Sequence, residues 1–324
     1  MKNVFVLLII ISFLSPISSS PPHLKYDSIF SFGDSLADTG NLLLSGARTF
    51  PYIAMLPYGE TFFHHPTGRC SDGRLIVDFI AEAYGLPYLP PYLAVAKGEK
   101  FEHGVNFAVA GATALDAKFF YDFGSQLLLT NDSLSVQLGW FSKLKSTLIC
   151  STRQDCARRF QKSLFLVGEI GGNDYNYPFF AGGTIQQLKA LVPLVVETIA
   201  NATSATCRLD ATRYLTLFRT PNKAAYDRNG CLKAYNGFSE YHNYNLKLAL
   251  ENLRHKYPHP KIIYGDYYAA AIRFFHAPYL YGFWNGALVA CCGGGGPYNF
   301  NNSAMCGSPG SKTCSDPTTY ANWD

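Results

Sequence analysis

Ser35 stands in the segment Phe32-Gly33-Asp34-Ser35, directly after a short apolar run. A serine hydroxyl that lies just beyond a strand can act as a nucleophile when a base accepts its proton. We expect Ser35 to begin a helix, where its own backbone N–H could bind a developing oxyanion. The alternative is an ordinary strand-to-helix turn that Asp34 or Ser35 caps. The Gly-x-Ser-x-Gly elbow of the α/β-hydrolases is excluded because Ala37 stands where its second glycine would be.

Two later turns offer hydrogen-bond donors for the same oxyanion. Gly111 ends the segment 106–111, and its N–H could approach a substrate closely because glycine has no side chain. Asn173, in the segment Gly171-Gly-Asn-Asp174, offers a side-chain amide. For either turn alone, a tight structural turn is the alternative. Since all three turns follow apolar strand-like runs in order, they are where we expect the chemistry.

The elements that must position these residues alternate between strand-like and helical patterns. Short apolar runs predict strands at 28–32, 105–109, 163–167 and 261–264. Apolar residues at helical spacing predict helices at 75–83, 184–200 and 239–255. This alternation predicts an α/β fold, a three-layer α/β/α sandwich with a mostly parallel sheet. In such a fold the ligand site lies beyond the carboxyl ends of the strands.

Six segments together resemble the SGNH/GDSL hydrolase family, specifically its large plant branch. They are 32–35, Thr67-Gly-Arg-Cys-Ser-Asp-Gly-Arg74, 106–111, 171–174, Cys291-Cys-Gly293 and Asp316-Pro-Thr-Thr-Tyr-Ala-Asn-Trp-Asp324. The resemblance implies a carboxylic ester hydrolase that forms an acyl-enzyme on Ser35. It also implies an oxyanion hole made by the N–H groups of Ser35 and Gly111 and the amide of Asn173. Asp324 would orient a catalytic histidine, and no metal or organic cofactor would be needed. Acyl or acetyl esters of small molecules, lipids or polysaccharides are the implied substrates.

The chain departs from the family pattern in two places. The family's last block is Asp-x-x-His, so the histidine would fall at position 327, whereas the sequence ends at Asp324. None of the eight histidines lies in a matching motif, and we expect solvated or structural roles for His103 and His242. The second departure follows the helix predicted to end at residue 200. There the segment 201–206 passes straight to Cys207, and an interior strand of the family is missing.

These departures leave two interpretations beside an active esterase. One is a partial or mis-spliced gene product that is C-terminally incomplete and has no activity. The other is a catalytically silent secreted protein that keeps the cleft and binds a ligand or glycan.

The first twenty residues have the features of a signal peptide: Lys2, an apolar run over 4–14 and small serines at 18–20. The apolar run is too short to span a bilayer, and no later stretch predicts a transmembrane segment. We therefore predict a single hydrolase domain over 21–324, secreted to the cell wall or apoplast or delivered to the vacuole. A net charge of +4 without a clustered basic stripe argues against a nucleic-acid partner.

Nine cysteines in an exported chain indicate disulfides. Cys150 and Cys156 enclose a short polar loop and form the first predicted pair. Further predicted partners, of open connectivity, are Cys207 with Cys231, and Cys291 or Cys292 with Cys306 and Cys314. Cys70 is expected to remain as a thiol. No histidine lies near these cysteines at the spacing of a zinc site. Glycosylation sequons begin at Asn131, Asn201 and Asn301.

Overall fold

The computed structural model describes residues 26–122, 124, 128–150, 152–206, 222–301 and 303–324. The predicted signal peptide and Cys207 lie outside the described residues. Residues 208–221, which follow Cys207, also lie outside them, so the predicted loss of an interior strand at this junction stays a prediction.

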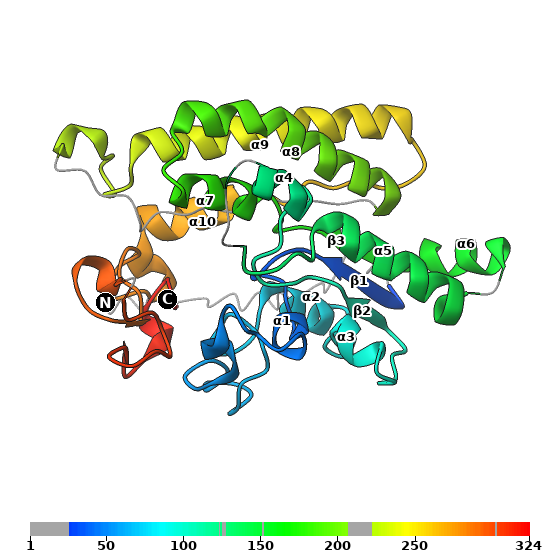
Figure 1. Cartoon of the computed structure of the whole chain (residues 1–324), viewed down its shortest axis with the longest axis horizontal. Helices are drawn as coiled ribbons and strands as arrows, with labels where there is room; N and C mark the ends of the chain where they lie inside the picture. Colours follow the sequence, from blue (N-terminus) through cyan, green and yellow to red (C-terminus); the bar gives the residue numbers. More distant parts are fainter. Residues whose placement is uncertain (1–25, 123, 125–127, 151, 207–221, 302) are drawn as a thin grey trace, which may run out of the picture.

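The elements follow one another in an alternating order (Figure 1). The strands are β1 (Ser28–Phe32), β2 (Gly104–Asn106), β3 (Ser163–Val167), β4 (Cys292–Gly293) and β5 (Lys312–Thr313). The α-helices are α1 (Asn41–Leu44), α2 (Ile76–Ala83), α3 (Tyr92–Val95), α4 (Ala117–Asp122), α5 (Leu134–Leu144), α6 (Arg153–Gln161), α7 (Gly172–Phe180), α8 (Ile185–Thr206), α9 (Lys233–Lys256) and α10 (Tyr267–His276).

The main described sheet is parallel, in the order β2-β1-β3. β1 lies at its centre, and its register pairs Ile29 with Gly104 on one side and with Leu164 on the other. All five residues of β1 are buried, as expected for an apolar strand between two neighbours and two covering layers. The turns after the three strands therefore meet at one edge of the sheet.

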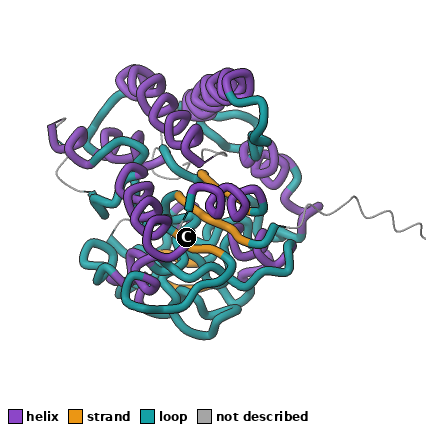
Figure 2. The backbone as a smooth tube through the Cα atoms, turned by 90° about the vertical axis from the view of Figure 1, so that its right-hand side faces the viewer, coloured by secondary structure: helices purple, strands orange, loops and turns teal. Residues whose placement is uncertain are grey.

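Alternate residues of β1 face different layers because side chains alternate across a strand. Phe30 and Phe32 belong to the large hydrophobic cluster that includes residues of α5, α8 and α9. Ile29 instead packs with Val77 and Ala81 of α2. Figures 1 and 2 show the strands between the layer of α7, α8 and α9 and the layer of α2 and α3. The predicted α/β/α sandwich with a parallel sheet is confirmed.

Two of the predicted strands differ from the structure. β2 is shorter than the predicted 105–109. Phe107 and Val109 N–H still donate to the carbonyls of Ser31 and Gly33, but Gly33 N–H donates to the Gln137 side chain and not back to this segment. The predicted strand 261–264 is wrong: only Tyr264 is a bridge residue. Arg254 of α9 donates to the Ile262 carbonyl at 3.0 Å, which uses an acceptor that a strand would offer to its neighbour.

The cysteine pairing is partly confirmed and partly decided by the structure. Cys150 is bridged to Cys156 as predicted. Among the four C-terminal cysteines, Cys291 pairs with Cys314 and Cys292 with Cys306. Cys70 is a half-buried free thiol, as expected. The predicted Cys207–Cys231 pair stays untested because Cys207 lies outside the described residues.

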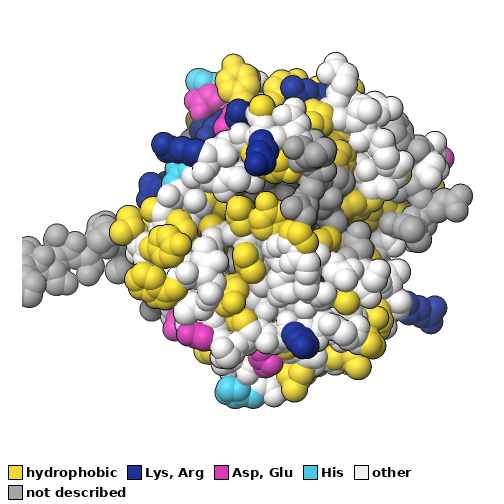
Figure 3. All heavy atoms as spheres, turned by 90° about the vertical axis from the view of Figure 1, so that its left-hand side faces the viewer, with side chains coloured by type: hydrophobic (Ala, Val, Ile, Leu, Met, Phe, Trp, Pro, Cys, Tyr) yellow, Lys and Arg dark blue, Asp and Glu magenta, His cyan; other side chains and the backbone are white. Residues whose placement is uncertain are grey.

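No helix within the described ranges is both long enough and apolar enough to cross a membrane. On the face drawn in Figure 3, several charged side chains gather toward the upper left, and hydrophobic side chains recur over the rest of the face. Exposed apolar side chains include Leu280 and Trp284, which are 83% and 66% exposed.

Candidate active site

Ser35 lies in a tight turn just beyond the carboxyl end of β1 and is half-buried. The N–H groups of Ala37 and Asp38 donate to the Asp34 carbonyl at 3.1 and 2.9 Å, which closes a single helical turn. The next helix, α1, begins only at Asn41. The expectation that Ser35 begins a helix is therefore wrong. The reason is that Asp38 accepts hydrogen bonds from the N–H groups at the start of α1 and so takes the capping role itself.

Gly33 allows the Ser35 turn to pass close to the end of β3. A Cβ atom on Gly33 would lie 2.3 Å from the Gly168 carbonyl oxygen, so a larger residue cannot fit without moving the backbone. Gln137 of α5 fixes the same residue from the other side: its amide accepts from Gly33 N–H at 3.0 Å and donates to Gly33 carbonyl at 2.9 Å. The turn that carries Ser35 is thus held on both sides.

Asp38 connects this turn to the chain that leads to Gly111. Its buried carboxylate accepts the N–H groups of Gly40, Asn41, Leu42 and Ala110 at 2.6–3.0 Å. One carboxylate therefore fixes the loop after β1 against the loop after β2.

Gly111 has a φ of +83°, a backbone conformation that favours glycine. A Cβ atom there would lie 2.4 Å from the Leu129 Cβ. Tyr177 of α7 donates its hydroxyl to the Gly111 carbonyl at 2.7 Å. Within the described chain no acceptor lies in hydrogen-bond contact with the N–H of Gly111 or of Ser35. Neither N–H group is therefore used by a hydrogen bond within the described chain.

Asn173 lies in the first turn of α7 and is buried. Its Nδ2 donates to the Ala112 carbonyl at 2.9 Å, and its Oδ1 accepts from Asn176 at 3.1 Å. The amide nitrogen carries two hydrogens, and this contact uses one of them. The neighbouring Asp174 accepts the N–H groups of Ala114 and Leu115 at 2.7 and 2.9 Å. The structure thus brings the Gly111 and Asn173 turns together.

Three buried carboxyl groups surround this region: Asp34, Asp38 and Asp174. Burial raises the pKa of Asp34 to about 8, and the charges of Asp174 and Asp38 add to the rise, while the Leu36 N–H opposes it. Burial likewise raises the pKa of Asp38 to about 6 and that of Asp174 to about 7, against the backbone N–H groups that bond them. Asp34 is therefore mostly protonated at neutral pH. Its Oδ2 has no hydrogen-bond partner among the described residues.

Asp324 is held by Tyr58, whose hydroxyl donates to its carboxylate at 2.5 Å. Burial of Tyr58, followed by the charge of Asp324, raises the pKa of this phenol, so that it stays protonated and donates. Trp323 packs edge-on against Tyr58, and its carbonyl accepts the Cys292 N–H at 2.7 Å. The C-terminal residues are thereby attached to the disulfide-bonded segment.

The pKa of the Cys70 thiol depends on Asp324 and also on the carboxyl groups of the loop after β1. Burial raises the pKa of the Cys70 thiol, and the charges of Asp324, Asp38 and Asp34 raise it further. The negative charges of these three carboxyl groups therefore all act on the same thiol.

The described histidines do not complete this arrangement. His64, His65 and His103 place Nδ1 against backbone carbonyls, and His242 is buried against Tyr175. His255 lies beside Glu251, and His259 and His276 are exposed. In the part of the chain that the structure describes, no histidine forms a hydrogen bond with Ser35 or Asp324.

Comparison with known proteins decides the family. Residues 29–315 match the sequence model of the GDSL-like lipase/acylhydrolase family. The chain belongs to this family. A GDSL esterase/lipase of Arabidopsis thaliana is 50% identical to it over 346 residues, which cover 100% of this chain and 93% of the relative. A sinapine esterase of Brassica napus is 48% identical over 323 residues, which cover 95% of this chain and 83% of the relative.

The family assignment makes this GDSL protein a serine ester hydrolase by descent. The Arabidopsis alignment spans 346 positions, whereas this chain has 324 residues, so at least 22 positions of the relative have no counterpart here.

Sequence reasoning missed several residues that build the site. Asp38, Gln137 and Asp174 each fix a turn through buried hydrogen bonds, and Tyr58 fixes the C-terminal residue through a part-buried one. Asp174 belongs to the segment 171–174, but its role depends on which N–H groups come near it. Tyr58 and Gln137 carried no local signal.

Proposed function

We propose that Ser35 is the nucleophile of this ester hydrolase and that the N–H groups of Ser35 and Gly111 and the Asn173 amide stabilise the oxyanion. Ser35 Oγ would attack the ester carbonyl, the alcohol would leave, and water would release the acid from the acyl-enzyme. The observation that carries this proposal is that the three hydrogen-bond donors each have a hydrogen that no described acceptor uses. The N–H groups of Ser35 and Gly111 have no acceptor among the described residues, and Ala112 fixes the direction of the Asn173 amide.

Asp324 is proposed as the group that orients a histidine base. Its carboxylate is fixed by Tyr58, and its charge acts on the Cys70 thiol together with the charges of Asp34 and Asp38. The base itself follows from the Asp-x-x-His block of the family, in which the histidine stands three positions after the aspartate.

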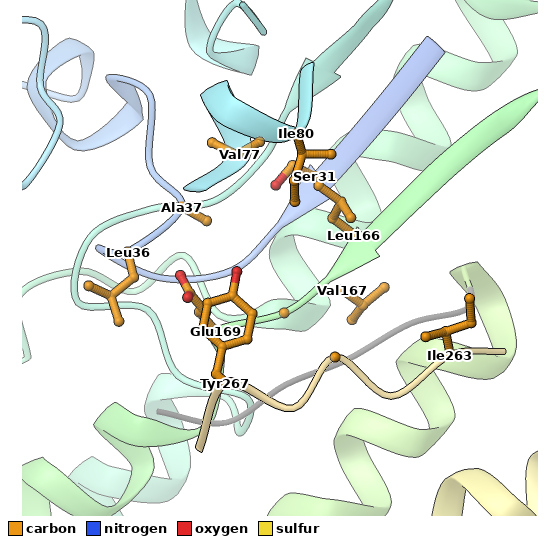
Figure 4. A pocket seen from close by; sticks show the side chains of 12 residues that line it. Ser31, Leu36, Ala37, Val77, Ile80, Leu166, Val167, Glu169, Ile263 and Tyr267 are labelled. Carbon is orange, nitrogen blue, oxygen red and sulfur yellow. The ribbon is translucent and has the colours of Figure 1, made fainter. Parts of the chain in front are cut away.

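The ester's acyl group is proposed to be apolar, which favours lipid-like or aromatic acyl esters over acetylated polysaccharides. A cavity of about 170 Å³ opens beside the Ser35 turn, between β3, α2 and the segment before α10 (Figure 4). Its lining is mostly aliphatic and includes Leu36, Ala37, Val77, Ile80, Leu166 and Ile263. An apolar cavity of about this size can hold a benzene-sized group. Since Leu36 and Ala37 directly follow Ser35, an acyl chain on the nucleophile could enter it.

Export and glycosylation belong to the same proposal. The side chains of Asn131, Asn201 and Asn301 are all exposed, as oligosaccharide attachment requires. The three disulfides indicate an oxidising compartment. The apoplast is the proposed destination, with the vacuole as the alternative.

A second candidate function is binding of an ester or glycan without turnover. The observation that favours it is the absence, within the described chain, of a histidine bonded to Ser35 or Asp324. A binding protein would keep the open donors and the apolar cavity.

The test compares the 324-residue chain with the same chain extended after Asp324 by the C-terminal residues of its Arabidopsis relative. Hydrolysis of p-nitrophenyl acetate and octanoate and of sinapine is measured, with thermal melts to confirm folding. Ser35→Ala should abolish turnover and leave the melt unchanged. Activity of Ser35→Ala above about a thousandth of the parent would refute the nucleophile. If both lengths bind octanoate without turnover, the binding function is supported instead.

A further inference from the structure

Tyr175 and His242 form a buried hydrogen bond between α7 and α9. The Tyr175 hydroxyl oxygen lies 2.6 Å from Nδ1 of His242, although the residues are 67 positions apart. The rings meet edge to face at a centroid distance of 5.4 Å, and Phe238 packs edge-on against the other side of the Tyr175 ring. Both polar groups are thus enclosed by the packing of the two helices.

Both partners are neutral. Burial lowers the pKa of His242 to about 4, and burial raises the pKa of Tyr175 well above its ordinary value. A neutral phenol and a neutral imidazole share one hydrogen in this contact, carried by the phenol oxygen or by Nδ1 according to the tautomer of the ring. His242 Nε2 has no hydrogen-bond partner among the described residues. Tyr175 therefore supplies the hydrogen bond that the structure gives to this imidazole.

The other side of the same helical turn carries Asn173 and contacts the loop after Gly111. Asn173 and Asp174 bond the backbone of Ala112, Ala114 and Leu115. Successive residues of an α-helix are rotated by about 100°, so Tyr175 points roughly away from Asn173. The first turn of α7 is therefore held between the loop after Gly111 on one side and α9 on the other.

The start of α7 is closely packed against α8 and α9. Gly171 caps the helix with φ +102°, and a Cβ atom there would lie 3.1–3.2 Å from Ile199 and Val195 of α8. The same point lies 3.9 Å from Cε1 of His242. The imidazole thus lies beside the entry to α7 and also shares a hydrogen bond with its first turn.

We propose that His242 is a positioning residue for ester hydrolysis: through Tyr175 it fixes the first turn of α7 and so directs the Asn173 amide at the oxyanion. The inference rests on the proposed role of Asn173. A donor acts on the transition state only if it is held at the oxyanion position in advance.

The kinetic test uses Tyr175→Phe, which removes only the hydroxyl, together with His242→Leu and His242→Asn. In the form that shows turnover, Tyr175→Phe and His242→Leu should lower kcat about 10- to 100-fold and change KM less than twofold, as expected from a misplaced catalytic donor. His242→Asn should recover most of the loss, because an asparagine side chain places a polar atom near the position of Nδ1. A rise in KM without a fall in kcat, or no change in either, would overturn the proposal.

A double variant separates positioning from general damage. In the Asn173→Ala background, Tyr175→Phe should lower kcat less than twofold further, because the group on which it acts is already gone. A full additional loss would show that Tyr175 acts elsewhere. If Asn173→Ala alone has no effect on kcat, the proposed oxyanion hole fails instead.

A second measurement needs no turnover and uses the 324-residue chain. Amide hydrogen exchange of 171–176 should speed up in Tyr175→Phe and His242→Leu but not in His242→Asn, while exchange in β1 stays unchanged. Unchanged exchange at 171–176 in Tyr175→Phe would show that the bond does not hold this turn and would overturn the proposal.

Discussion

The amide nitrogen of Asn173 donates a hydrogen bond to the carbonyl oxygen of Ala112 at 2.9 Å. This contact joins the turn after β3 to the turn after β2 across the central strand. It orients the amide and leaves its second hydrogen for another acceptor. The proposed oxyanion hole is therefore built before any substrate arrives, which is the condition under which such donors lower a barrier most.

Replacing Asn173 by alanine should lower kcat by roughly 10²–10³ with a smaller effect on KM, because the amide bonds mainly the charged transition state. Steady-state kinetics on p-nitrophenyl butyrate would measure this, with a thermal melt to account for the lost bond to Ala112. If KM rose while kcat stayed the same, Asn173 would be a substrate-positioning residue.

Filling the apolar cavity should change the preference for acyl-chain length. Ile80→Phe adds volume to the lining and should lower kcat/KM for p-nitrophenyl octanoate relative to the acetate by about tenfold, the effect of one or two lost methylene contacts. Ile76→Phe is the matched control, because Ile76 lies one turn earlier on α2 and is 45% exposed. An unchanged octanoate-to-acetate ratio in Ile80→Phe would place the acyl chain elsewhere.

Asp34→Asn should make the stability of the protein less sensitive to a rise in pH from 5 to 8. The folded pKa of Asp34, about 8, is above its unfolded value of 3.8, so its contribution to stability is full below pH 3.8 and is lost as pH rises to about 8. Asparagine does not titrate. Relative to wild type, the variant should therefore gain at least about 1 kcal/mol, or about 2 °C in Tm, between pH 5 and pH 8.

Thermal melts of Asp34→Asn over this pH range provide the measurement. Asp122→Asn, at an exposed position on α4, is the control and should follow wild type throughout. Parallel curves for Asp34→Asn and wild type would show that Asp34 stays ionised in the folded protein.

His242 should have the opposite dependence. Its folded pKa of about 4 is below its unfolded value of 6.5, so the folded state resists protonation and loses stability as pH falls from 6.5 to 4. His242→Asn removes this titrating group. The free energy of unfolding of the variant relative to that of wild type should therefore be about 2–3 kcal/mol higher at pH 4.5 than at pH 7. Chemical unfolding at the two pH values measures the difference. Equal differences at both values would mean that the imidazole is not buried as a neutral ring.

Local patterns in the sequence determined the parts of this protein that depend on neighbouring residues. β1 and β3 were predicted at their observed bounds because short, wholly apolar runs suit strands buried on both faces. The Cys150–Cys156 bridge was predictable because the chain itself keeps these cysteines close. The motifs that carry Ser35, Gly111 and Asn173 were visible, and with them the family.

Tertiary structure alone decided how those turns are held. Tyr58 meets Asp324 across 266 positions, and Gln137 meets Gly33 across 104. Asp38 proved to accept the N–H groups of Asn41 and Leu42 at the start of α1 and that of Ala110, and α1 begins at Asn41, which overturned the expected helix start at Ser35. Which of Cys291 and Cys292 bonds Cys314 also depended on packing. Such contacts join residues far apart in the chain, and their partners are set by how the layers pack; no spacing within one segment encodes them.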